Sequence, residues 1–325
     1  MISKSRALAK RVRTAGVSAL CIVAGAATGA VLTIGQIGTS ASAAEIPGDD
    51  LIGVTVRYRA VTSDTFVAIA EKFHLGYMEL IEANPGINPW VPDGEVLILP
   101  AAQILPDAPR QGIVVNLAEL RLYFYPADGG PVQSYALGIG REGWATPLGD
   151  TTVRGKRANP TWTPPASIRA EDPTLPKVVP AGPNNPLGAH AIYLGWDAYL
   201  IHGTNRPAGV GRRVSHGCIR MYAQDVDALF RQVAAGTSVT VVDQPVKVGW
   251  RHGELFLEIH PTLAQVDALE MHGKFGPGLL PDVMGLVRAA AGDAMARVDI
   301  RKVWRAALDR NGIPQKITVS DTPDA

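Results

Sequence analysis

Residues 201–221 read IHGTNRPAGVGRRVSHGCIRM, which places two histidines and a cysteine in one segment rich in glycine. A thiol is a useful nucleophile only as its thiolate, so a catalytic cysteine needs a nearby imidazole that takes its proton. His202 and Cys218 fit this requirement, because the glycines and Pro207 between them favour a loop that brings its two ends together. The segment therefore predicts a site for cysteine acyl transfer.

The two histidines of this segment are expected to have different roles. His202 is the expected base for Cys218. His216 lies only two residues before Cys218, so in an extended segment both side chains lie on one face. Its backbone N–H, with those of Gly217 and Cys218, forms a candidate oxyanion hole, and Gly217 lets an acyl carbonyl approach the backbone closely.

Two other interpretations of the same residues remain open. An isolated cysteine is often an inert, buried apolar residue, and an isolated histidine often has only a structural role. A zinc site would need His202, His216 and Cys218 as ligands. A single cysteine with no C-x-x-C motif and no spaced histidine pair is a poor set of zinc ligands.

Several short motifs around this segment resemble the L,D-transpeptidases, the YkuD-domain family. SHGCIRM at residues 215–221 and IHGTN at residues 201–205 are similar to the family's active-site motif. TPLG at residues 146–149 is similar to its T-P-x-G turn, and the strand at residues 239–242 also matches, so the resemblance covers about residues 111 to 250. It implies a mainly β catalytic domain, a mixed β-sandwich or barrel with one buttressing helix.

The resemblance also implies an activity and a mechanism. The cysteine that matches Cys218 attacks the bond between meso-diaminopimelate and D-alanine in a peptidoglycan tetrapeptide stem, which gives a thioester that an amine then cleaves. The histidine that matches His202 is the base, and the backbone carbonyl at Gly203 orients it, so neither a triad carboxylate nor a cofactor is expected. Carbapenems acylate this family in general, because they resemble a strained acyl donor.

Four further residues are expected to bind the substrate. Arg220 matches a position that is basic in many family members, and a guanidinium there suits a carboxylate of an anionic muropeptide. A purely structural salt bridge is the alternative role for Arg220. The other three are Ser215, Thr204 and Asn205.

The N-terminus has the features of an export signal. An apolar stretch at about residues 15–37 precedes Ala41-Ser42-Ala43, an A-x-A pattern that predicts a signal peptide over residues 1–43 and cleavage before Ala44. Five basic residues come first: Lys4, Arg6, Lys10, Arg11 and Arg13. The expected location is therefore the periplasm, with an uncleaved membrane anchor as the alternative. Cleavage would leave Cys218 as the only cysteine, which is easier to explain by reactivity than by packing.

Residues 54–100 are expected to form a small unit with the order strand, helix, helix, strand. Ser63-Asp64-Thr65 supplies a helix N-cap, and Asn84-Pro85-Gly86 ends the second helix. With Tyr58 and the strand LILP at residues 97–100, this segment resembles a LysM domain, a family that binds glycans containing N-acetylglucosamine. A structural cap on the catalytic domain, without glycan affinity, is the alternative.

The next segments are expected to be a stiff linker at residues 101–110 and a mainly β catalytic domain at residues 111–243. Eight prolines crowd residues 160–186, so we expect a long loop without helix there, beside the site. The length of this loop suggests a lid over the substrate. A helix is expected to begin near Tyr222 and to support the cysteine loop.

The C-terminal extension, residues 244–325, is expected to begin with a hairpin whose turn is at residues 251–254. Helices are expected near residues 263–271 and 282–308. His252, His260 and His272 are expected to be surface residues and not metal ligands, because no helical i, i+4 pairing links them. This tail resembles the extension of the ErfK/YbiS subgroup, which includes enzymes that transfer the stem peptide to a lysine of an outer-membrane lipoprotein and enzymes that make direct cross-links.

The sequence thus predicts a periplasmic L,D-transpeptidase whose partners are peptidoglycan stem peptides and glycan strands, and whose acceptor amine is open. Nucleic acid is not an expected partner, because 31 Lys and Arg residues balance 30 Asp and Glu residues. Membrane contact is expected only through an uncleaved signal segment. A hydrolase that releases the same thioester to water and a non-catalytic wall-binding protein are the alternatives from other classes.

Overall fold

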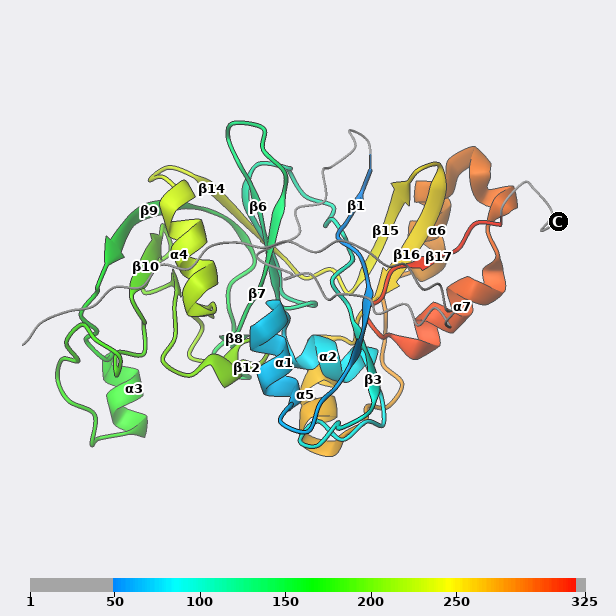
Figure 1. Ribbon diagram of the computed structural model, residues 1–325. Helices are drawn as coiled ribbons and strands as arrows, with labels where there is room; N and C mark the ends of the chain where they lie inside the picture. The colour runs from blue at the N-terminus through cyan, green and yellow to red at the C-terminus, as the bar shows by residue number, and fades with distance from the viewer. Residues whose placement is uncertain (1–48, 320–325) are drawn as a thin grey trace, which may run out of the picture. The chain divides into compact units, whose positions relative to one another are not determined.

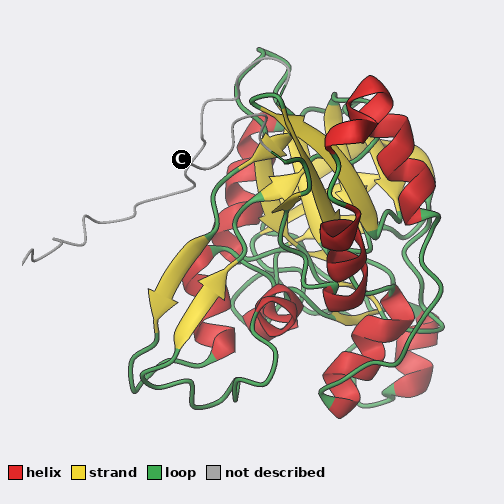
Figure 2. Ribbon diagram, turned by 90° about the vertical axis from the view of Figure 1, so that its right-hand side faces the viewer, coloured by secondary structure: helices red, strands yellow, loops and turns green. Residues whose placement is uncertain are grey.

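The computed structural model describes residues 49–319, and the predicted signal peptide lies outside this range. The described chain has more strands than helices, so the predicted mainly β class is confirmed (Figure 2). Within residues 49–319, no helix has the length and apolar character needed to cross a membrane.

A mixed sheet of eight strands forms the centre of the catalytic region, in the order β13-β11-β10-β9-β14-β5-β6-β7. Figure 1 labels β6, β7, β9, β10 and β14 of this sheet. Its strands are β5 (Gly112–Asn116), β6 (Arg121–Tyr125), β7 (Gln133–Ala136), β9 (Gly149–Ala158), β10 (His190–Leu194), β11 (Leu200–His202), β13 (Ile219–Arg220) and β14 (Ser238–Val242). β5 and β6 are buried along nearly their whole length, which explains their continuous apolar and aromatic runs. β14 runs parallel to β5 and antiparallel to β9, and β11 runs parallel to β13.

The sequence analysis missed β9, the longest strand of this sheet. Its sequence GDTTVRGKRA contains one fully buried residue, Val153, and its other side chains are exposed or half-buried. A strand with so little apolar alternation has no period-two signal, and only its pairing with β10 and β14 makes it a strand.

The proline-rich segment between β9 and β10 contains a short helix, so the prediction of a loop without helix was wrong. Helix α3 (Ala166–Glu171) fits between Pro165 and Pro173, and its six residues contain no proline. Pro165 is its N-cap residue, where a missing backbone N–H costs nothing. None of the residues of α3 is buried.

The N-terminal unit has the predicted order of elements. β2 (Val56–Arg59) pairs antiparallel with β3 (Val96–Leu99), and α1 (Phe66–Phe73) and α2 (Tyr77–Ala83) lie between them in the chain. The Thr65 side chain caps α1 by accepting a hydrogen bond from the N–H of Ala68. Apolar residues of this unit and of the large sheet belong to one continuous core, which includes Phe66, Leu80 and Leu122.

The expected linker has regular structure of its own. Within it, β4 (Gln103–Ile104) pairs antiparallel with β1 (Leu51–Ile52), and the Ile104 side chain is fully buried.

Two short elements and one helix complete the catalytic region. β8 (Ile139–Gly140) pairs parallel with β12 (Arg213–Ser215), and the 3₁₀ turn η1 (Pro207–Gly209) lies within the loop that was expected to bring His202 and Cys218 together. Helix α4 (Ala223–Gln232) begins after Tyr222, as predicted, and packs on β10 (Figure 1).

The C-terminal extension opens with the predicted hairpin. β15 (Val246–Arg251) pairs with β16 (Glu254–Ile259) around a turn at His252 and Gly253, and β17 (Gln315–Lys316) joins β16 on its other edge. Helix α5 (Leu263–His272) lies where a helix was expected. The single helix predicted over residues 282–308 is instead three pieces, because Gly292 and Asp299 interrupt it: α6 (Val283–Ala291), η2 (Gly292–Arg297) and α7 (Ile300–Asp309).

Candidate active site

Two parallel strands bring His202 and Cys218 together. His202 is the last residue of β11, and Cys218 immediately precedes β13. The register pairs Ile201 with Ile219 and His202 with Arg220. Because paired residues share a face and side chains alternate along a strand, His202, Cys218 and Arg220 lie on the same face of the sheet. The 16-residue separation in sequence thus becomes adjacency in space.

The backbone carbonyl of Gly203 fixes the orientation of the His202 ring. The imidazole is 4% exposed, and its Nδ1 lies 2.6 Å from the carbonyl oxygen of Gly203. A carbonyl only accepts, so Nδ1 carries the proton and Nε2 is left as the basic nitrogen. Burial lowers the pKa of His202 to about 4, against the opposing effect of the Gly203 hydrogen bond, so the ring is neutral near pH 7.

Cys218 is half-buried, and among residues 49–319 it is a free cysteine. It donates to the carbonyl oxygen of Ala198 at 3.4 Å, and no hydrogen bond between described residues joins it to His202. Burial raises the pKa of the thiol, although the Leu200 N–H and the charge of Arg220 partly oppose this effect. Near pH 7 the resting site therefore holds a neutral thiol and a neutral imidazole.

The backbone around Cys218 holds unused hydrogen-bond donors. No hydrogen bond within residues 49–319 uses the N–H of His216, Gly217 or Cys218. The Thr146 hydroxyl donates to the carbonyl oxygen of Gly217 at 2.8 Å, and the Ser215 hydroxyl donates to that of Cys218 at 2.5 Å. Since the C=O and N–H of one peptide unit point in opposite directions, Thr146 fixes the direction of the Cys218 N–H. The sequence analysis placed Thr146 in a turn and gave it no role in the site.

Gly217 is required for both space and conformation. Its φ is +97°, and a Cβ built on it would lie 2.9 Å from Cε1 of Tyr199. Any side chain there would strain the backbone that carries the free N–H groups.

The residues expected to bind substrate have different surroundings. The Arg220 guanidinium lies beside the site, burial lowers its pKa, and its Nε is buried without a hydrogen-bond partner. Ser215 is fully buried and holds the Cys218 carbonyl, so its observed contact is structural. Thr204 accepts from the N–H of Arg206, and Asn205 donates to the carbonyl oxygen of Asn184, so both also have partners within the protein.

Three residues that the sequence analysis did not single out surround the side chain of His216. Glu171, at the end of α3, has one carboxylate oxygen 2.9 Å from Nε2 of His216, and it accepts from Arg141. The indole ring of Trp144 meets the imidazole edge-on, with ring centroids 4.9 Å apart. None of these residues belongs to a short motif, which explains why the sequence alone did not reveal them.

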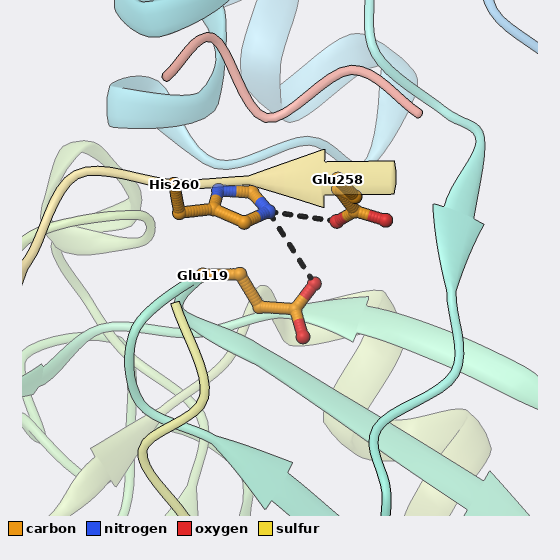
Figure 3. Close-up of side chains that lie close together, drawn as sticks. All are labelled: Glu119, Glu258 and His260. Carbon is orange, nitrogen blue, oxygen red and sulfur yellow. Dashed lines mark hydrogen bonds and ion pairs between the residues drawn. The ribbon is translucent and has the colours of Figure 1, made fainter. Parts of the chain in front are cut away.

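A cluster elsewhere resembles a metal site in composition. Glu119, Glu258 and His260 each have a ligand atom within 4.8 Å of the others (Figure 3). The Nζ of Lys247, however, lies 2.6 Å from Glu119 Oε2 and 2.8 Å from Glu258 Oε1, so a lysine ammonium is already the cation bound by both carboxylates. A metal ion would have to share this space with a positive charge, and the cluster does not fit one.

The prediction that His260 is a surface residue was wrong. The ring is 3% exposed, and its two nitrogens face Glu258 at 2.7 Å and Glu82 at 3.3 Å. Burial opposes its charge, but hydrogen bonds and the charges of both carboxylates outweigh burial and raise its pKa to about 10. A histidine protonated on both nitrogens has no lone pair for a metal. His252 and His272 are exposed, as predicted.

A half-buried thiol, a neutral imidazole with a fixed tautomer and free backbone donors, set in a mainly β domain, are the features of a cysteine acyl-transfer enzyme. Comparison with known proteins gives the family. The model of the YkuD L,D-transpeptidase catalytic domain matches residues 110–241.

Proteins of Escherichia coli K12 are similar over most of this chain. The protein named Probable L,D-transpeptidase YcfS is 43% identical over 280 residues, which cover 82% of this chain and 85% of that protein. Probable L,D-transpeptidase ErfK/SrfK is 39% identical over 281 residues, with 83% and 88% covered. Among solved structures, the E. faecium L,D-transpeptidase catalytic domain acylated by ertapenem is 25% identical, covers 40% of this chain and 95% of that chain, and has a TM-score of 0.32. The chain belongs to the L,D-transpeptidase family, whose members act on peptidoglycan stem peptides.

Proposed function

We propose that this L,D-transpeptidase works in the periplasm with Cys218 as the nucleophile, His202 as the base and the N–H groups of His216, Gly217 and Cys218 as the oxyanion hole. The acyl donor is the diaminopimelate–D-alanine bond of a tetrapeptide stem. The acceptor is an amine, either on the diaminopimelate of a second stem or on a lysine of an outer-membrane protein. Export through residues 1–43 would deliver the enzyme to this substrate.

The observation that carries this proposal is the hydrogen bond from Nδ1 of His202 to the Gly203 carbonyl. It gives the imidazole a defined tautomer with a basic Nε2 on the face of the sheet that also holds Cys218. A backbone carbonyl thus does here what a carboxylate does in a Ser-His-Asp triad, namely orient the ring.

The steps of the reaction follow from this arrangement. Nε2 of His202 takes the thiol proton as the sulfur attacks the peptide carbonyl, and the free N–H groups receive the negative charge of the tetrahedral oxygen. The imidazolium then protonates the leaving amine of D-alanine, which leaves a thioester on Cys218. In the second half-reaction, His202 takes a proton from the acceptor amine as the amine attacks the thioester. The imidazolium then returns this proton to the departing sulfur, which restores the thiol of Cys218.

The direct test is mass spectrometry of the full chain after incubation with a purified tetrapeptide stem. The mass of the chain is expected to increase by that of the tripeptide acyl group, with the adduct on Cys218. When an amine acceptor is added, the product should contain this acceptor joined to the tripeptide. Release of free tripeptide even when the acceptor is in excess would favour a hydrolase over a transferase. The absence of an adduct on Cys218 would contradict the assigned nucleophile.

His202 is tested by replacement with glutamine. We expect His202→Gln to lower the rate of acylation by about 10²–10⁴-fold, because the general base is lost while the size of the side chain is nearly kept. His216→Ala should have a smaller effect on thiol reactivity, because its proposed catalytic group is a backbone N–H. The measurements are the rate of Cys218 acylation by a tetrapeptide stem and, for thiol ionisation, the pH profile of Cys218 alkylation by iodoacetamide. A profile in which only His216→Ala alters thiol ionisation would reverse the two assignments.

We also propose that the LysM-like segment, residues 54–100, binds glycan strands. Support comes from Trp90, which is 61% exposed in the connection between α2 and β3. An exposed indole presents a flat apolar face and a polar N–H, which suits a sugar ring. A second contact with the same polymer raises the local concentration of stem peptides around Cys218 without new catalytic contacts.

Trp90→Ala is expected to weaken co-sedimentation with insoluble peptidoglycan while acylation by a small carbapenem stays unchanged. A point variant is preferable to deletion of the segment, because Glu79 of α2 is buried in an ion pair with Arg121 of β6. Deletion would leave that arginine buried and unpaired. Trp304→Ala is the matched control, since Trp304 on α7 is 55% exposed. Equal sedimentation of both variants and the wild type would contradict glycan binding through Trp90.

A further inference from the structure

The side chains of Arg141 and His216 direct hydrogen-bond donors at one point beside the active site. Nη2 of Arg141 lies 2.6 Å from Oε2 of Glu171, and Nε2 of His216 lies 2.9 Å from the same oxygen. The second oxygen of Glu171 is 2.9 Å from Nη2 of Arg141. The two donor nitrogens are 3.1 Å apart, as expected for two groups that share one acceptor. Together, Arg141 and His216 form a carboxylate seat, and Glu171 occupies it.

The two donors come from the fixed part of the structure. Arg141 follows β8, and its N–H donates to the carbonyl oxygen of Ser215 at 3.0 Å, which ties it to the segment that carries His216 and Cys218. Trp144 packs edge-on against His216. The backbone that carries the seat is therefore held in place, and His216 lies two residues before the proposed nucleophile, Cys218.

The carboxylate comes from a part of the structure that is held weakly. Glu171 ends α3, a helix of six residues of which none is buried. Within residues 49–319, the side-chain hydrogen bonds and ion pairs that α3 makes outside its own segment are those of Glu171. The side chains of Arg141 and Glu171 are 42% and 43% exposed, and an ion pair so open to water contributes little net stability. A second carboxylate can therefore displace Glu171 at low cost.

The substrate class supplies such a carboxylate. Peptidoglycan stem peptides carry free carboxylates close to the bond that L,D-transpeptidases cleave. A guanidinium beside a second N–H donor suits a carboxylate better than any neutral group. His216 keeps its oxyanion-hole role, since that role uses its backbone and the seat uses its side chain.

We infer that Arg141 and His216 bind a carboxylate of the stem peptide, and that Glu171 occupies this seat in the free enzyme until the substrate displaces it. This inference rests on the proposed function, because it places the peptide beside Cys218. Glu171 acts as an internal competitor, and α3 moves away when the substrate binds. Arg141 is a specificity-determining residue for anionic donors.

The alternative role of the ion pair is a latch that keeps the loop in a productive position, and the two roles differ in the sign of one effect. If Glu171 competes with the substrate, Glu171→Gln strengthens peptide binding and Arg141→Gln weakens it. If the pair is a latch, both substitutions weaken binding alike. Asp172→Asn is the matched control, because Asp172 is the next residue on the same loop and, among residues 49–319, its side chain bonds only with Thr174.

The experiment measures the Kd of a tetrapeptide stem by calorimetry on the full chain carrying Cys218→Ala, so that no reaction interferes. We expect Glu171→Gln to lower Kd by about 2- to 5-fold and Arg141→Gln to raise it by about 10-fold or more, with partial rescue by Arg141→Lys. A series of stem peptides is then titrated, in each of which one carboxylate is replaced by an amide. For one of these peptides, Arg141→Gln should no longer change the Kd. That peptide identifies the group that sits in the seat.

Two results would overturn the inference: an increase in Kd for Glu171→Gln as large as that for Arg141→Gln, or an equal effect of Arg141→Gln on the anionic and the fully amidated peptide. Asp172→Asn should match the parent protein in every titration. Because binding is measured without the nucleophile, these results stand apart from the proposed function. That function is tested separately by the Cys218 adduct of the wild type.

Discussion

Cys218→Ala is expected to reduce turnover on a tetrapeptide stem by several orders of magnitude, while the fold stays intact. Loss of a covalent nucleophile leaves only binding and the oxyanion hole, and in well-studied triad enzymes this costs about 10⁶-fold in kcat. Among the described residues, the thiol donates one weak hydrogen bond, to the carbonyl oxygen of Ala198, so its removal costs little in hydrogen bonding there. The measurement is the rate of product formation, with circular dichroism as the check on folding.

The nucleophile can also be identified without a natural substrate. A carbapenem should add its mass to the wild type and not to Cys218→Ala. Arg206→Gln, a change in the same loop at an exposed side chain, serves as the matched control and should still be acylated. Residual turnover above about 1% in Cys218→Ala, or a carbapenem adduct that persists in it, would show that another residue attacks the substrate.

The parts of the fold that the sequence predicted correctly are those with a local signal. Thr65 caps α1 as its position before an apolar run suggested, and the β15–β16 hairpin turns at the predicted residues. β9 and α3 were missed because their sequences contain no buried apolar pattern. Long-range pairing makes β9 a strand, and the absence of proline between Pro165 and Pro173 permits α3.

The same distinction applies to the site. Motif residues such as His202 and Cys218 are joined by a segment rich in glycine, so their proximity was predictable, although the strand β13 that follows Cys218 was not. Arg141 and Glu171 are 30 residues apart, and neither belongs to a motif. Only the folded chain shows that they meet at His216. The burial of His260 was equally invisible, because three segments meet around it: its own, which holds Glu258, and two distant ones, which hold Glu82 and Glu119.

Those three segments meet in a buried network of charges, and the second large effect is expected there. Glu82 lies on α2, Glu119 precedes β6, and Lys247, Glu258 and His260 belong to the C-terminal extension. The Lys247 side chain is 1% exposed, and those of Glu119 and Glu258 are fully buried. Lys247 also donates to the carbonyl oxygen of Ile104 at 2.6 Å, so one ammonium joins the linker region to both carboxylates.

Lys247→Met is expected to lower the free energy of unfolding by about 3–5 kcal/mol, because it removes the ammonium that two buried carboxylates share and leaves His260 as the remaining cation of the network. Methionine keeps the length of the side chain, so the loss is one of charge and not of volume. Urea denaturation followed by tryptophan fluorescence measures it. Lys274→Met is the control at an exposed lysine and should change stability by less than about 0.5 kcal/mol. Equal midpoints for the two variants would show that the network contributes no net stability.

The pH dependence of stability tests the same network through His260. Its pKa is about 10 in the folded protein and about 6.5 in an unfolded chain, so the folded state holds a proton that the unfolded state releases. The stabilisation is complete below about pH 6.5 and is lost as pH rises towards about 10. Between about pH 7 and pH 9.5, the wild type should therefore lose more stability than His260→Gln, which has no proton to release. Parallel curves for the two proteins would mean that the Glu82 and Glu258 carboxylates do not hold a charged imidazole, and the network would then have one cation, Lys247, instead of two.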